Sequence, residues 1–296
     1  MRCERIDADW LRAHPLPAVQ SGADKNARGR VLVAGGAEFV PGALRLTGEA
    51  ALRAGAGKLQ MATVRSAAMS LGVLVPEAAM IALPAQEDGE IAAEAAQILA
   101  PRISACDALI VGPGMSVSKE TDELVAGLLS AADPPSAIIL DAAALTSVRD
   151  LAPLVRAHER DMILTPHHGE MAILSGRSEQ AVAADPQAAA ADMARHFGAV
   201  VLLKGKRSFI AGPDGMLLSH EVDCVGLATG GSGDVLAGLV GGLSARGAEP
   251  IEAAAWAIWI HGQAGQRLAK QVGPVGFLAR ELLPLIPALL HEASRQ

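Results

Sequence analysis

Short apolar runs that alternate with helical segments constrain the fold of this 296-residue chain more than any other feature. Runs such as Arg30–Ala34, Ala108–Val111 and Ala137–Leu140 are apolar on both sides of the chain, as strands buried on both faces of a sheet are. The helical segments between them indicate βα units. The pattern therefore predicts an α/β fold, in which helices flank a mostly parallel central sheet to give three layers.

The expected elements cover nearly the whole chain. Residues 1–28 are expected to form a short helix and then a loop, with 1–24 as a lead segment. Strands are expected at 30–34, 59–64, 78–83, 108–111, 137–140, 162–164 and 199–203, and helices at 42–54, 91–101, 181–194, 234–246 and 252–270. The helix that contains Ile91, Ala95 and Ile98 is predicted to end at Pro101. The runs 208–211 and 216–219 flank a Gly-Pro-Asp-Gly turn and predict an antiparallel hairpin. Because no linker-like segment interrupts the pattern, we expect a single domain over 1–296.

A polar residue or a glycine directly follows several of the predicted strands. Gly112, Asp141, Thr165 and Lys204 each follow one of the predicted strands. In open α/β sheets ligands bind at the carboxyl edge of the strands, where these residues would meet. A single Gly or Asp at such a position is explained equally well as a strand terminator. The recurrence over several strands favours a ligand site at this edge.

Composition excludes several classes of function. Lys and Arg number 25 against 32 Asp and Glu, which gives a net charge of −7, and aromatic residues are 2% of the chain with no Tyr. Without a basic field or aromatic platforms, neither duplex binding nor single-strand stacking is expected, so nucleic acid is not a predicted partner. A small anionic ligand remains compatible, because backbone amides can bind it locally.

Cysteine usage and hydropathy indicate a reducing compartment. Cys3, Cys106 and Cys224 are odd in number and widely spaced, which predicts neither a disulfide framework nor a zinc site. The first residues carry several charges rather than the apolar core of a signal peptide. No apolar run approaches the roughly 18 residues of a membrane span. The sequence therefore predicts a cytoplasmic protein without a membrane partner.

A glycine-rich loop leads into an apolar helix at Gly231, Ser232, Gly233 and Asp234. Glycines before a helix let consecutive amides point into one space, where the helix dipole adds positive potential. A transferring phosphoryl group would fit there. Asp234 is either a helix cap or a base that takes the proton of an attacking hydroxyl. The glycines of 235–243 favour close packing of this helix on another backbone.

At this point the chain resembles a known family. GGSGD with the helix LAGLVGGLSARG is similar to the signature of the ribokinase-like superfamily, and several further segments resemble the nucleotide-dependent NAD(P)H-hydrate dehydratases. In chain order these segments are GRVLVAGG with PGA at 41–43, ALRAGAG at 51–57, VGPG at 111–114, LD at 140–141, LTPHHGE at 164–170, LKG at 203–205 and HGQAG at 261–265. The resemblance covers about residues 25–290. It implies a ribokinase-like α/β/α sandwich.

The resemblance also implies an activity, namely repair of a hydrated nicotinamide cofactor. In this family the hydroxyl of NAD(P)H hydrate is phosphorylated by ADP, or by ATP, with Mg²⁺, and loss of phosphate returns NAD(P)H. The chemistry is reasonable, because hydroxide leaves poorly and phosphate leaves well. The implied partners are hydrated NADH or NADPH and an adenine nucleotide, with the epimerase as a separate protein because the chain has no fused epimerase domain. We also expect a homo-oligomer, since multimers are common for this fold.

Site residues are carried over position by position. The catalytic group comprises Asp234 as base with the amides of Gly231, Ser232 and Gly233 as anion hole. The substrate contacts are Ala43, Gly114, His167 and Asp234, and the nucleotide contacts are Lys204, Gly205, Lys206, Arg207, Ser208 and Gly233. Glu170, acting through water, is the expected metal-proximal carboxylate, and Asp141 is a second candidate at that edge. His261 is expected to be a satisfied, partly buried histidine without a ligand.

The chain departs from the family pattern at two positions. Ala143 replaces a second Asp after Asp141, and Ser116 stands where a further Gly is usual after Gly114. These departures bear on metal binding near Asp141 and on the fit of the dinucleotide near Gly114.

Two alternatives to the dehydratase therefore stay open. A sugar or vitamin-alcohol kinase of the same fold would use the same loop and keep the phosphate on its product. A nucleotide-binding protein without catalysis would bind but not turn over.

Overall fold

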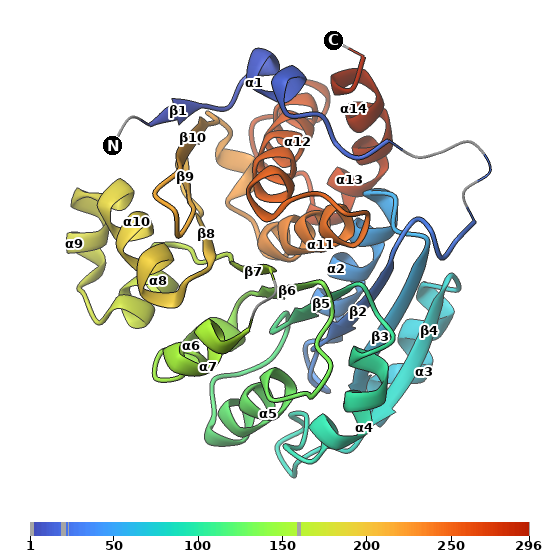
Figure 1. The fold of residues 1–296 in the computed structure, drawn as a ribbon. Helices are drawn as coiled ribbons and strands as arrows, with labels where there is room; N and C mark the ends of the chain where they lie inside the picture. The colour runs from blue at the N-terminus through green and yellow to red at the C-terminus, as the bar shows by residue number, and fades with distance from the viewer. Residues whose placement is uncertain (1–2, 19–21, 23, 159–160, 296) are drawn as a thin grey trace.

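The strands form one 10-stranded sheet in the part of the chain that the computed structural model describes, residues 3–18, 22, 24–158 and 161–295 (Figure 1). The strands are β1 (Glu4–Arg5), β2 (Arg30–Ala34), β3 (Lys58–Val64), β4 (Ala78–Leu83), β5 (Ala108–Val111), β6 (Ala137–Leu140), β7 (Asp161–Leu164), β8 (Val200–Leu203), β9 (Arg207–Ala211) and β10 (Leu217–Glu221). Their order across the sheet is β1-β10-β9-β8-β7-β6-β5-β2-β3-β4. The sheet is parallel except at β9, which pairs antiparallel with β8 and β10.

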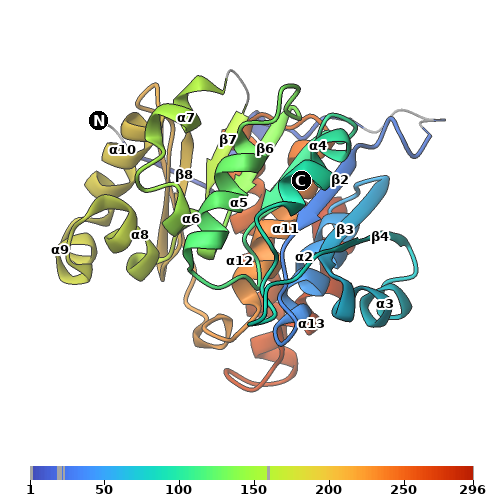
Figure 2. The same cartoon turned by 90° about the horizontal axis from the view of Figure 1, so that it is seen from below.

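Helices cover both faces of this sheet. They are α1 (Ala8–Ala13), α2 (Pro41–Arg53), α3 (Arg65–Leu74), α4 (Ala95–Ile103), α5 (Lys119–Leu129), α6 (Ala143–Ser147), α7 (Ala152–Ala157), α8 (His168–Ser175), α9 (Glu179–Ala184), α10 (Pro186–Phe197), α11 (Ser232–Ala245), α12 (Pro250–Gln271), α13 (Ala279–Leu282) and α14 (Ile286–Ala293), with short 3₁₀ turns η1 (Val225–Leu227) and η2 (Leu283–Leu285). Figures 1 and 2 show α2, α11 and α12 on one side of the sheet and α4 to α8 on the other.

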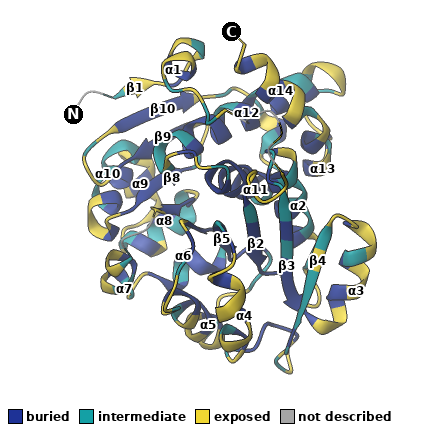
Figure 3. Ribbon diagram, turned by 45° about the vertical axis from the view of Figure 1, so that its right-hand side comes forward, coloured by how far each residue is buried: buried dark blue, intermediate teal, exposed yellow. Residues whose placement is uncertain are grey.

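Alternation along the strands builds two separate cores. Val31 and Val33 of β2 pack with α2, α11 and α12, whereas Leu32 and Ala34 pack with the helices of the opposite face. This follows from the period of two in a strand, which sends successive side chains to opposite faces. Both cores are apolar, so the central strands are buried on both sides (Figure 3). The predicted three-layer α/β fold with a mostly parallel sheet is confirmed.

Helix α11 packs unusually close to α2 because of its glycines. A Cβ built on Gly238 would collide with the carbonyl oxygen of Thr47, and one on Gly242 would lie 2.6 Å from the carbonyl oxygen of Ala51. On the other side, a Cβ on Gly241 would collide with Ile110 of β5. The expected close packing of this helix is therefore present, and it fixes the position of its N-terminus relative to α2 and the sheet.

The expected elements are present with three corrections. Helix α4 starts at Ala95, after Ile91, and continues through Pro101; its buried stripe is Ala95, Leu99 and Ile103, while Ile98 is 46% exposed. Pro101 lies inside this helix, so its missing amide costs the helix the bond that this position would make to the carbonyl oxygen of Gln97.

The second correction divides the alanine-rich segment 181–194 into α9 and α10. Asp185 accepts a hydrogen bond from the amide of Ala188 and Pro186 begins the second helix, so a new helix N-terminus forms inside the segment. The third correction adds β1, which pairs with β10 ahead of the expected lead helix α1.

None of the described helices combines the length and the apolar character that crossing a membrane requires.

The α2–α11 contact makes a testable prediction about stability. Gly238→Ala introduces a methyl group against a backbone carbonyl, which a rotamer change cannot relieve, so the free energy of unfolding falls by roughly 1–3 kcal/mol. Gly42→Ala in the first turn of α2 is the control, because no heavy atom lies within 4 Å of its Cβ position. Denaturant unfolding of both variants measures the difference, and equal midpoints would contradict the close approach.

Candidate functional site

The carboxyl ends of β6, β7 and β8 meet in a buried ionic network. The ammonium of Lys204 donates to Asp141 Oδ1 at 2.8 Å and lies 3.7 Å from Glu170 Oε2. The hydroxyl of Thr165 donates to the same Asp141 oxygen at 2.7 Å. The Asp141 side chain is 3% exposed, and that of Lys204 17%. Each strand end therefore contributes one polar side chain to one fixed cluster.

Helix α8 positions Glu170 for this cluster. Its N-cap His167 accepts hydrogen bonds at Nδ1 from the amides of Gly169 and Glu170, and Glu170 Oε2 accepts from the amide of His167 at 2.8 Å. This reciprocal capping box holds the carboxylate beside Lys204. Nε2 of His167 lies 3.5 Å from Glu170 Oε1, and the ring is 58% exposed. The imidazole of His167 is thus accessible to a ligand at the edge of the cluster.

The N-terminus of α11 lies directly beside Lys204. A Cβ on Gly233 would be 3.5 Å from Lys204 Nζ. Gly231 has φ +89° and faces Leu46 of α2, so a side chain there would be both strained and obstructed. The amide of Ser232, expected in the anion hole, instead donates to the carbonyl oxygen of Thr229, and that of Val235 donates to Gly231. The first-turn amides of Gly233 and Asp234 have no backbone acceptor within the described residues, so Asp234 takes the place of Ser232 among the available donors. Free amides, the helix dipole and an ammonium group together make an anion site.

Asp234 has the properties of a base in this setting. Burial, and after it the negative charge of Asp141, raises the pKa of Asp234 to about 7 against the opposing effect of Lys204. Burial acts to lower the pKa of Lys204, but Asp141 and Glu170 outweigh it and the pKa is raised. Lys204 therefore stays charged while Asp234 exchanges its proton near neutral pH. Perturbed pKa values of this kind cluster at functional sites.

Ala43 of α2 and Gly114 of the loop after β5 come together. Gly114 has φ +71°, and a Cβ there would lie 3.0 Å from that of Ala43 and 2.7 Å from the carbonyl oxygen of Val40. The amide of Gly36 donates to the carbonyl oxygen of Pro113 at 2.7 Å and joins the loops after β2 and β5. Gly112 in turn packs against the carbonyl group of Asp141. The two expected substrate positions thus lie together, and Gly112, two residues before Gly114, joins their loop to the backbone of Asp141.

The segment that follows Lys204 is a tight turn into β9. The hydroxyl of Ser208 donates to the carbonyl oxygen of Gly205 and accepts from its amide. Lys206 pairs with Asp223 at 3.2 Å, and the guanidinium of Arg207 lies 5.2 Å over the ring of Phe209. Within this segment, Lys204 contacts the cluster, Lys206 contacts the loop after β10, and Arg207 contacts β9 and β10.

The two departures from the family pattern have clear structural settings. Ala142, immediately before Ala143, has φ 49°, the one positive value among the described residues other than glycine, and such backbone is strained. The amide of Ser116 donates to the buried carboxylate of Glu90 at 3.2 Å. No group of three or more His, Cys, Asp or Glu in the described ranges is placed to hold a metal.

Sequence reasoning missed the contact of His261 with this site. His261 lies in α12 and is buried rather than partly buried, and its Nε2 is 2.9 Å from Ser232 Oγ and 3.1 Å from the Ser232 carbonyl oxygen. The motif at 261–265 gave the position, but nothing in the sequence pairs it with a residue so distant along the chain. The ion pair of Asp141 with Lys204 was likewise not predicted, although both strand ends were.

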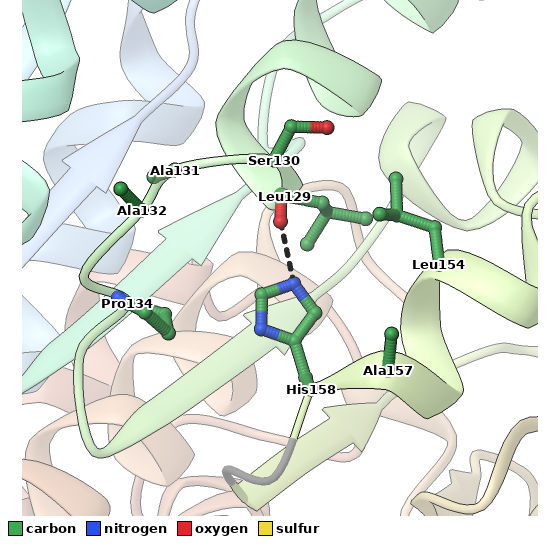
Figure 4. A pocket seen from close by; sticks show the side chains of 8 residues that line it. All are labelled: Leu129, Ser130, Ala131, Ala132, Pro134, Leu154, Ala157 and His158. Carbon is green, nitrogen blue, oxygen red and sulfur yellow. Dashed lines mark hydrogen bonds between the residues drawn. The ribbon is translucent and has the colours of Figure 1, made fainter.

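A hollow elsewhere on the molecule is not part of this cluster. It has a volume of about 340 Å³ and is lined by Leu129, Ser130, Ala131, Ala132, Pro134, Leu154, Ala157 and His158 (Figure 4). The lining segments precede β6 and β7, so the hollow lies at the amino ends of these strands. Nε2 of His158 donates to the carbonyl oxygen of Leu129 at 2.6 Å, which makes the ring part of the local packing.

Two lysines in one loop allow a matched test of the ionic network. Lys204→Met leaves Asp141 and Glu170 without their buried partner and lowers the free energy of unfolding by about 3 kcal/mol. Lys206→Met removes an exposed pair with Asp223 and changes it by less than about 0.5 kcal/mol. Chemical denaturation at neutral pH measures both. Equal effects would show that the network does not hold the strand ends.

Comparison with known proteins agrees with this geometry. The family model described as NAD(P)H-hydrate dehydratase matches residues 31–288. An ADP-dependent (S)-NAD(P)H-hydrate dehydratase from Xanthomonas campestris pv. campestris is 47% identical over 99% of this chain and 98% of its own length. A bifunctional NAD(P)H-hydrate repair enzyme Nnr from Moorella thermoacetica is 36% identical over 98% of this chain, which spans 54% of that longer protein.

Solved structures give the same result. The ADP/ATP-dependent NAD(P)H-hydrate dehydratase of Bacillus subtilis, co-crystallised with ATP and Mg²⁺, has a TM-score of 0.82 at 26% identity and aligns over 99% of both chains. A ribokinase-like superfamily protein from Enterococcus faecalis has a TM-score of 0.83 at 24% identity, which supports the ribokinase-like fold. With a family match over most of its length and a relative of high identity over nearly all of it, this chain belongs to the NAD(P)H-hydrate dehydratase family.

Proposed function

We propose that this protein is an ADP-dependent NAD(P)H-hydrate dehydratase, which returns (6S)-NAD(P)H hydrate to NAD(P)H. The observation that carries the proposal is the position of Asp234, a base with a pKa of about 7, at the N-terminus of a helix that also faces Lys204. The names of the Xanthomonas campestris and Bacillus subtilis relatives support the substrate and the use of an adenine nucleotide.

The reaction needs one phosphoryl transfer and one elimination. Asp234 takes the proton of the substrate hydroxyl while the hydroxyl oxygen bonds to the terminal phosphorus of ADP. The bond between this phosphorus and the bridging oxygen breaks, and AMP leaves. The amides of Gly233 and Asp234, together with Lys204, stabilise the charge on the transferring group. The carbon–oxygen bond then breaks with its electron pair leaving on phosphate, driven by the nitrogen lone pair of the ring, and a ring proton is lost. The products are NAD(P)H, AMP and phosphate.

The remaining site residues have supporting roles in this proposal. Ala43, Gly114 and His167 contact the hydrated dinucleotide, and the turn at 204–208 contacts the adenine nucleotide. Mg²⁺ would be held by phosphate oxygens and water, with Glu170 as a water-bridged partner, because the carboxylates of Asp141 and Glu170 both face the Lys204 ammonium. When bound, the ion would neutralise phosphate charge.

Recovery of the near-ultraviolet absorbance of reduced nicotinamide tests this function directly. Chemically hydrated NADH and NADPH are incubated with the protein, Mg²⁺ and ADP, ATP or no nucleotide. Nucleotide-dependent recovery is expected, with ADP preferred. Asp234→Asn should reduce the rate by at least about 100-fold, since general-base catalysis contributes that much or more. Absence of recovery by folded protein would overturn the proposal, and a product that retains phosphate would indicate a kinase instead.

The pKa of Asp234 predicts the pH dependence of this reaction. Because the base must be ionised, kcat/KM rises tenfold per pH unit below about pH 7 and becomes constant above it. Glu170 contributes to the raised pKa, so Glu170→Gln moves the midpoint of this limb to lower pH. Initial rates across the pH range, with protein stability checked at each pH, measure the midpoint. A limb near pH 4, the ordinary range of an Asp, would contradict the assignment of Asp234 as the perturbed base.

A further inference from the structure

The HGQAG motif of α12 is not used by the chemistry above, although it contacts the segment 222–232, which leads into the catalytic loop at residues 231–234. Its first residue, His261, is buried and reaches Ser232, the first residue of α11, through Nε2. The next residue, Gly262, packs against Val222, whose Cγ2 would lie 2.5 Å from a Cβ on this glycine. Gly265 packs in the same way against Leu227, at 2.6 Å. Helix α12 therefore contacts the segment from 222 to 232 at both of its ends and near its middle.

The contact between His261 and Ser232 is a hydrogen bond, whereas the contacts of Gly262 and Gly265 with Val222 and Leu227 are apolar packing. Both atoms within reach of Nε2, the hydroxyl and the carbonyl oxygen, belong to Ser232, so either ring tautomer ties the two residues together. A protonated Nε2 donates to the carbonyl or hydroxyl oxygen, and an unprotonated one accepts from the hydroxyl. Burial lowers the pKa of His261 to about 4, so the ring is neutral at physiological pH. It therefore acts as a fixed hydrogen-bonding group without changing charge beside Lys204.

From this geometry we infer that His261 is a positioning residue, which holds Ser232 so that the following amides of Gly233 and Asp234 face the transferring phosphoryl group. The inference rests on the proposed function of the α11 N-terminus. His261 contacts neither reacting group. Ser232, however, is the first residue of α11 and directly precedes Gly233 and Asp234, whose amides form the anion hole. The amides and Asp234 lie within one turn of it, so a rotation of Ser232 displaces all of them together. Misplacement by about 1 Å of a group that stabilises a transition state costs on the order of 100-fold in rate.

A second buried histidine provides a matched control. His220 of β10 is 8% exposed, and its Nε2 would lie 3.0 Å from a Cβ on Gly262, so it packs on the same helix. Its Nδ1 is 3.4 Å from the carbonyl oxygen of Ile6, and its Nε2 has no hydrogen-bond partner among the described residues. His220 thus resembles His261 in burial and neighbourhood but makes no hydrogen bond to the catalytic loop.

Variants at the two histidines separate positioning from general packing. His261→Leu should lower kcat about 100-fold while the KM for nucleotide changes by less than about threefold, because the contact matters for the transition state. His261→Gln, whose amide reaches the place of Nε2, should restore most of kcat. His220→Leu should keep kcat within about threefold of the wild type. Loss of kcat in both leucine variants alike, or in neither, would overturn the inference.

A second readout keeps the inference testable whatever the protein catalyses. Amide hydrogen exchange of a peptide that covers residues 229–235 should accelerate about tenfold or more in His261→Leu, and remain near the wild-type rate in His261→Gln and His220→Leu. Equal exchange in all four proteins would overturn the positioning role. If wild-type protein gives no cofactor recovery, the proposed function fails, and the exchange result still decides whether His261 orders the loop.

Discussion

The ammonium of Lys204, held between Asp141 and Glu170, is the interaction on which the site depends. It joins the ends of β6 and β8 to the first turn of α8, and Thr165, at the end of the intervening strand, donates to the same Asp141 oxygen. A buried ion pair of this kind adds little net stability, because desolvation offsets the Coulomb attraction, but its loss leaves an uncompensated charge. The ion pair places a permanent positive charge beside Gly233, and, after burial, the carboxylates of Asp141 and Glu170 raise the pKa of Asp234.

Packing of α11 supplies the other half of the site. Small residues let its backbone approach α2 and β5, so the helix N-terminus is fixed by the core rather than by a flexible loop. The amides of its first turn then face the same space as the Lys204 ammonium. Preorganised donors of this kind need no reorganisation when charge develops, which is why they are effective in phosphoryl transfer. Asp234 is buried at this N-terminus, and its burial raises its pKa.

Much of this arrangement was predictable from the sequence, because strands buried on both faces and a glycine-rich turn before a helix are local patterns. The strand-end positions of Asp141, Thr165 and Lys204 and the loop at 231–234 were identified in this way. The start of α4 was not, because the apolar residues Ile91 and Ile98 mimic a helix face that the chain does not use. The division at Asp185 was missed because helix propensity outweighed the capping signal of Asp-Pro. Contacts between distant segments, such as His261 with Ser232, leave no local signal at all. The roles assigned to Ala43, Gly114, His167 and the 204–208 turn remain predictions.

The fate of the substrate oxygen tests the central claim most directly, since phosphorylation before elimination dictates where that atom goes. NADH hydrate prepared in water enriched in oxygen-18 carries the label in its hydroxyl group, and the reaction is then run in ordinary water with ADP. If Asp234 directs that hydroxyl to phosphorus, inorganic phosphate should contain one labelled oxygen for each cofactor recovered, with an equal amount of AMP. Unlabelled phosphate, with the label released as water, would show that the hydroxyl leaves without phosphorylation and would contradict the account.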